Sequence, residues 1–84
     1  MSLKDDFEAA QKAAKALPSR PSNDDLLQLY AFFKQANTGD CTGKRPGMMD
    51  FAGQAKYDAW KKKAGTGRDD AMQAYVDLVK KLGA

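Results

Sequence analysis

The topology of this chain is decided by residues 38–49, TGDCTGKRPGMM, near the middle of the sequence. This stretch holds three glycines, a proline and little hydrophobic periodicity, so it predicts a loop. Twelve extended residues span roughly 40 Å, whereas a helix of sixteen residues is about 24 Å long. The loop is therefore long enough to run back along the molecule, which predicts that the helices on its two sides are parallel.

Hydrophobic residues recur at helical spacing on both sides of this loop, as in Leu3, Phe7, Ala10, Ala14 and Leu17. The pattern predicts four helices, over approximately residues 4–17, 23–37, 50–63 and 67–82. Proline ends the first helix, and Ser22 or Asn23 is expected to cap the second. Thr66 and Asp69 resemble a capping box ahead of the fourth.

The other two connections, residues 18–22 and 65–66, are short, which predicts that the helices joined by each are antiparallel neighbours. With 84 residues the chain has room for one domain, taken as residues 1–84. The expected fold is all-α, an up-down-down-up four-helix bundle.

Composition excludes several kinds of chemistry. The chain has no histidine and one cysteine, Cys41, which removes the commonest acid–base group, an internal disulfide, a zinc cluster and a Cys–His nucleophile. We therefore expect no catalytic residue, no metal and no cofactor. The net charge of +3 is only a mild bias toward anionic partners. Acidic residues follow the N-terminus where a secretory signal would be apolar, and no stretch has the about 20 apolar residues of a membrane-spanning helix. We therefore expect a cytoplasmic protein.

Lysines lie one helical turn from aromatic residues on two of the expected helices. Tyr30 and Lys34 are four residues apart and share a helix face, and Lys56 and Trp60 repeat the spacing. A lysine ammonium can meet a phosphate, a phenol can donate a hydrogen bond, and an aromatic face can stack on a base. The pattern favours a ligand with a phosphate and a flat ring, and the candidate binding residues are Lys15, Tyr30, Phe33, Lys34, Lys56 and Tyr75.

Each of these residues also has a structural interpretation. Aromatic residues at helical spacing commonly form the core, and helical lysines commonly form a solvated face. Met48 and Met49 are expected to fill the core beneath the loop. A different function, a small basic helical nucleic-acid-binding module, would use Lys61, Lys62 and Lys63, but it calls for a denser basic face than a net charge of +3 provides.

Several stretches of the sequence resemble the acyl-CoA-binding protein family. They are YAFFKQA at 30–36, GD at 39–40, RPGMMDF at 45–51, AKYDAW at 55–60 and DDAMQAY at 69–75, in register from Phe7 to about Leu82. The resemblance implies a four-helix bundle that binds medium- and long-chain acyl-CoA esters without catalysis. It implies an intracellular carrier and pool buffer, a monomer that contacts acyl-CoA-using enzymes or membranes transiently and binds no nucleic acid.

The resemblance also implies roles for individual residues. Tyr30 and Lys34 would engage the adenine and the 3′-phosphate of CoA, Lys56 the same phosphate, Tyr75 the nucleotide and pantetheine, and Lys15 the head group. Trp60 corresponds to a buried packing tryptophan. The chain departs from the family at three positions: Phe33 stands where many members have tyrosine, and Ala52 and Gln54 stand where lysine is common.

Overall fold

The computed structural model describes residues 2–83, and these form four helices and no strand. The helices are α1 (Leu3–Lys15), α2 (Asn23–Thr38), α3 (Phe51–Lys61) and α4 (Arg68–Lys81). Their bounds differ by up to two residues from the expected ranges. Helix α1 ends at Lys15 because Pro18 keeps the residue before it out of helical geometry. The chain after α3 tightens into short-range turns and then passes through Gly65 at φ +88°.

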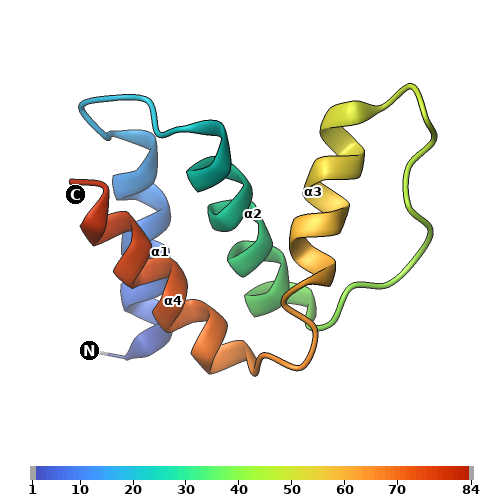
Figure 1. Cartoon of the computed structure of the whole chain (residues 1–84). Coiled ribbons are helices and arrows are strands. Elements are labelled where there is room, and N and C mark those ends of the chain that lie inside the picture. The colour runs from blue at the N-terminus through green and yellow to red at the C-terminus, as the bar shows by residue number, and fades with distance from the viewer. Residues whose placement is uncertain (1, 84) are drawn as a thin grey trace.

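The direction of each helix follows from Figure 1. α1 and α4 run one way, α2 and α3 run the other, and the loop after α2 returns along the outer side of α3 (Figure 1). The prediction of an all-α, up-down-down-up bundle is confirmed.

The expected antiparallel neighbours are not the pairs whose backbones pack closely, however. Among residues 2–83, close backbone packing joins α2 with α4, α2 with α3, and α1 with α4, whereas α1 with α2 and α3 with α4 have none. The short connections fix the direction of these helices but not their contact, since a few extended residues can separate two helix ends by more than a packing distance. The bundle is consequently flat, with extents of 40 × 28 × 15 Å, and α3 packs against α2 alone.

The core lies where α1, α2 and α4 meet. Aromatic rings form its centre: Phe7 and Tyr75 make an edge-to-face pair with centroids 5.1 Å apart. Around them are packed the buried residues Ala10, Leu29, Ala36, Ala71, Val76 and Val79.

A polar junction ties the end of α2 to the turn between α3 and α4. The buried Gln35 donates from Nε2 to the Asp40 carboxylate and to the Thr66 carbonyl, both at 2.8 Å. The same Asp40 oxygen accepts the Gly65 N–H at 2.8 Å, and Trp60 Nε1 donates to the Gly39 carbonyl at 2.9 Å. The junction holds α3 and α4 at the foot of α2.

Two expectations about side chains were wrong. Met48 and Met49 do not fill the core: they are 83% and 90% exposed, because the loop runs outside α3 and not over the core. Thr66 does not cap α4, whose N-cap is Gly67 and has no side-chain hydrogen bond. The cap of α3 is Asp50, whose carboxylate accepts the Gly53 N–H at 2.9 Å.

Candidate functional site

Three predicted site residues from three different helices meet at one hollow. Lys15 comes from α1, Phe33 from α2 and Tyr75 from α4, and together they help line a hollow of about 340 Å³. Its other lining residues are Gln11, Ala14, Pro21, Leu26 and Leu29. The three-helix contact that forms the core therefore also forms this first hollow.

Tyr75 belongs to the core and to the first hollow at once. Its ring packs against Phe7 and Phe33, with centroids 5.1 and 6.4 Å away, and the residue is 6% exposed. Burial raises the pKa of the Tyr75 hydroxyl above its ordinary value. The group is therefore a neutral phenol at physiological pH, and it has no hydrogen-bond partner among residues 2–83.

A second hollow lies between α2 and α3 and has a volume of about 480 Å³. Its apolar lining includes Leu26 and Leu27 on α2 and Ala55 on α3, and Lys56 stands beside them. The remaining lining residues are Arg20, Asn23, Phe51 and Ala52. Leu26 lines both hollows, so the two are neighbours across a single side chain.

Tyr30 and Lys34 line neither hollow directly. The Lys56 ammonium lies over the Tyr30 ring, 5.5 Å from its centroid, and the Lys34 ammonium lies over the Trp60 ring at 5.0 Å. These cation–π contacts join α2 to α3. Tyr30 is thus brought to the second hollow through Lys56, whereas Lys34 is directed toward the buried Trp60.

The charge of the two hollows has one sign. Lys15 is the cation of the first, and Arg20 and Lys56 are the cations of the second, with no aspartate or glutamate in either lining. Most of the other side chains that line the two hollows are apolar. Such a surface attracts an anion that carries an apolar part.

Sequence reasoning missed several lining residues. Arg20 lies in the segment that was interpreted only as a helix stop, and its guanidinium contacts Asn23 Oδ1 at 3.4 Å. Leu26 and Leu27 follow the general helical spacing of hydrophobic residues, which predicts only packing, yet both line the second hollow. The available signal in the sequence was a pair of adjacent leucines, which is too wide for one packing stripe, a few residues after an arginine.

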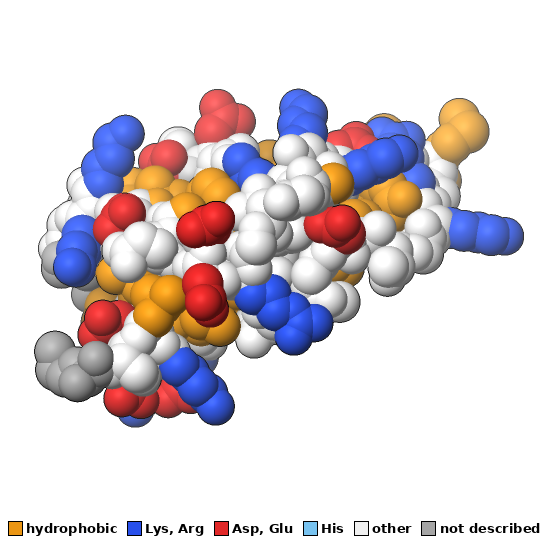
Figure 2. Space-filling model, turned by 90° about the horizontal axis from the view of Figure 1, so that it is seen from below, with side chains coloured by type: hydrophobic (Ala, Val, Ile, Leu, Met, Phe, Trp, Pro, Cys, Tyr) orange, Lys and Arg blue, Asp and Glu red, His pale blue; other side chains and the backbone are white. Residues whose placement is uncertain are grey.

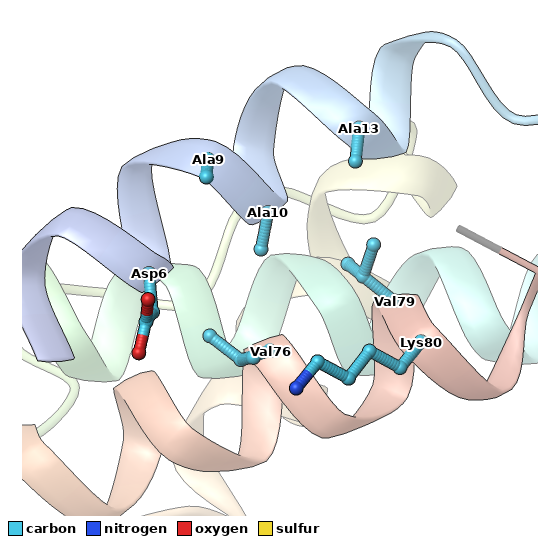
Figure 3. Close-up of a pocket in the computed structure, with 7 residues that line it drawn as sticks. All are labelled: Asp6, Ala9, Ala10, Ala13, Val76, Val79 and Lys80. Atoms are coloured by element: carbon cyan, nitrogen blue, oxygen red, sulfur yellow. The ribbon is translucent and has the colours of Figure 1, made fainter. Parts of the chain in front are cut away.

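A third hollow lies between α1 and α4 and contains none of the predicted site residues. Figure 3 shows Ala9, Ala10 and Ala13 on α1 facing Val76 and Val79 on α4. Its two charged residues, Asp6 and Lys80, have opposite signs. This hollow offers no net attraction to an anion, in contrast to the other two.

The remaining chemistry is sparse. Among residues 2–83, no group of three or more potential acidic, cysteine or histidine ligands could hold a metal ion, and no helix has the length and apolar character needed to cross a bilayer.

Comparison with known proteins gives consistent results. Residues 4–79 match the family model for acyl-CoA-binding protein. The chain is 49% identical to the acyl-CoA-binding protein homolog of Manduca sexta over 83 residues, covering 98% of this chain and 92% of the relative. It is 51% identical to acyl-CoA-binding protein homolog 1 of Caenorhabditis elegans over 76 residues, covering 90% and 88%. Among solved structures, the crystal structure of Oryza sativa acyl-CoA-binding protein 2 superposes with a TM-score of 0.92 at 41% identity, covering 96% of this chain and 90% of that one.

Proposed function

The chain belongs to the acyl-CoA-binding protein family, and from this membership we propose that it binds medium- and long-chain acyl-CoA esters reversibly. We further propose that it serves as an intracellular carrier and pool buffer for them. The observation that carries the proposal is the pair of adjoining hollows, with three cations, no acidic side chain and an apolar surface. An acyl-CoA ester matches this surface, because it joins an anionic nucleotide to an apolar tail.

The tail is assigned to the second hollow, where Leu26, Leu27 and Ala55 supply apolar surface. Burying a methylene group is worth about 0.8 kcal/mol, so the roughly fifteen hydrocarbon groups of a sixteen-carbon tail could contribute about 12 kcal/mol at most. Part of this gain is offset by the ordering of the ligand and the loss of its free motion. The tail therefore sets most of the strength of binding.

The nucleotide is assigned to the lysines and tyrosines around the two hollows. Lys34 and Lys56 would turn from their aromatic faces to the 3′-phosphate. An exposed cation–π contact is worth about 0.5–1 kcal/mol, whereas a hydrogen bond to a charged group is worth about 1.5–3 kcal/mol, so the exchange is favourable. Tyr30 would contact the adenine, Lys15 the head group, and the Tyr75 hydroxyl the nucleotide and pantetheine, with Phe33 as apolar surface beside it.

We also propose that the ester leaves the protein unchanged. The absence of histidine from the whole sequence supports this proposal, since histidine is the usual acid–base group at neutral pH. Incubating the ester with the protein and measuring free thiol tests it, because hydrolysis would release the thiol of CoA. We propose that the protein is a cytoplasmic monomer that uses no cofactor and binds no nucleic acid. In this proposal it passes its ligand to enzymes or membranes through transient contacts.

Calorimetric titration with three ligands tests the binding proposal. Palmitoyl-CoA should bind tightly in a one-to-one complex, whereas CoA lacks the tail and palmitate lacks the nucleotide, so each should bind far more weakly. Palmitate that bound as tightly as the ester would contradict a role for the nucleotide site. CoA that bound as tightly would contradict the role of the second hollow.

A further inference from the structure

Three large hydrophobic side chains are exposed where the long loop enters α3. Met48 is 83% exposed, Met49 90% and Phe51 74%, and we call these three residues the apolar tip. Figure 2 shows a hydrophobic side chain projecting from the end of the molecule where this loop lies, with basic side chains close by. Clustered exposed hydrophobic residues of this size commonly mark an interaction surface.

The loop that presents the apolar tip is braced against α3. The Tyr57 hydroxyl donates to the Gly43 carbonyl at 3.1 Å, and Arg45 forms a two-pronged ion pair with Asp58 at 3.0 Å. One turn earlier, Gln54 Nε2 donates to the carbonyls of Pro46 and Gly47 at 3.1 and 2.9 Å. The exposed methionines therefore belong to a loop that several hydrogen bonds hold in place.

The charges around the apolar tip are mostly positive. Lys44 and Arg45 precede it, of which Arg45 is paired with Asp58, and residues 41–49 contain no acidic side chain. Phe51 lines the second hollow together with Arg20 and Lys56. The acidic residue within this region, Asp50, has its carboxylate engaged with the first turn of α3.

We propose that the apolar tip docks on an anionic lipid surface. Met48, Met49 and Phe51 enter the headgroup region, and Lys44 and Arg20 meet the lipid phosphates. Apolar side chains flanked by cations bind such interfaces by combined burial and electrostatic attraction. A second copy of the chain fits less well, because two basic tips repel each other and three side chains fall short of the about 800 Å² per partner that a stable dimer buries.

Docking in this orientation has a consequence for the ligand, which rests on the proposed function. Phe51 belongs both to the apolar tip and to the second hollow. The hollow assigned to the acyl tail therefore opens beside the lipid surface when the tip is docked. An acyl chain could then pass between bilayer and protein with little exposure to water.

Vesicle binding without any acyl-CoA tests the docking separately from ligand binding. The wild-type protein should partition onto phosphatidylcholine vesicles that contain phosphatidylserine, and little onto phosphatidylcholine alone. The double variant Met48→Ser/Met49→Ser should partition about tenfold less, and Lys44→Ala should also bind less. The matched control is Lys12→Ala, an exposed lysine on α1 away from the loop, which should bind like the wild type.

The double variant also separates docking from the proposed function. Neither methionine lines a hollow, so its palmitoyl-CoA affinity in solution should equal that of the wild type. Equal vesicle binding by the double variant and the wild type would overturn the docking proposal. The proposal would also be overturned if the wild type formed a concentration-dependent dimer that the double variant does not form. The apolar tip would then bind a second copy of the chain.

Discussion

A single hydroxyl group separates the two roles of Tyr75. The ring packs in the core against Phe7 and Phe33, while the residue also lines the first hollow and its hydroxyl has no hydrogen-bond partner among residues 2–83. We predict that Tyr75→Phe weakens palmitoyl-CoA binding by about 0.5–1.5 kcal/mol and leaves the melting temperature nearly unchanged. Calorimetry and thermal unfolding measure the two effects. A large loss of melting temperature with unchanged affinity would assign the hydroxyl to the core.

Lys34 tests the proposed phosphate site. Its ammonium now lies over Trp60, and the proposal has it turn to the 3′-phosphate of CoA. We predict that Lys34→Ala weakens palmitoyl-CoA binding by roughly 2 kcal/mol. The penalty should be much smaller with the ester of dephospho-CoA, which lacks that phosphate.

The control for Lys34 is Lys63, which also rests on an aromatic ring, that of Phe32, at 4.5 Å. Lys63 lines none of the hollows and has no proposed contact with the ligand. Lys63→Ala should therefore leave the affinity unchanged. An equal penalty of Lys34→Ala on both esters would refute the phosphate role and leave Lys34 as a packing partner of Trp60.

Residue types in the sequence predicted some of the residues that line the hollows, but not what each side chain contacts. Lys15 and Tyr75 were named as candidates from their residue types and the family resemblance, and the structure brings both to the first hollow. The sequence could not show that Lys34 lies over Trp60, because the contact depends on how α2 and α3 pack. The exposure of Met48 and Met49 was also missed, since their hydrophobicity carries no information about which side of α3 the loop follows.

At the scale of the elements, Asp40 links the end of α2 to the turn before α4. The Gly65 N–H, and secondly the Gln35 amide, lower the pKa of this carboxyl below 3.8. A pKa lower in the folded than in the unfolded state stabilises the fold above the unfolded pKa, and the contribution is lost as the pH falls through the folded pKa. We therefore predict that Asp40→Ala lowers the melting temperature at neutral pH, by an amount that shrinks as the pH falls below about 4.

Thermal unfolding of both proteins between neutral pH and about pH 3 measures this difference. Asp58, whose pKa is lowered by its hydrogen bonds from Arg45, is present in both proteins and cancels in the comparison. A difference that stayed constant across the range would show that the Asp40 carboxylate does not act through its charge.

The elements illustrate what loop length can and cannot predict. The length of residues 38–49 correctly implied that α2 and α3 are parallel, because the extended loop outreaches a helix. The short connections gave the right directions for α1 with α2 and for α3 with α4, but not which helix pairs make the close backbone contacts. Those contacts depend on which apolar faces match, and Phe7, Tyr75 and Val76 pair α1 with α4 across the chain.

At the scale of the whole molecule, flatness creates the candidate site. Because α3 packs on α2 alone, the groove between them stays open as the second hollow, and the first hollow adjoins it at Leu26. The cations from α1, α3 and the segment before α2 surround this region, although the net charge of the chain is only +3. The attraction for an anionic ligand therefore comes from where the charges lie, which composition alone did not reveal.

The central claim is that these two hollows form one acyl-CoA site, and amide chemical-shift mapping by NMR tests it most directly. On titration with palmitoyl-CoA, we predict saturable one-to-one changes at Leu26, Leu27, Phe33, Ala55 and Tyr75. The α1–α4 hollow of Figure 3, at Ala9 and Lys80, should remain unaffected. Changes concentrated in that third hollow, or none at Leu26 and its neighbours at saturation, would contradict the account.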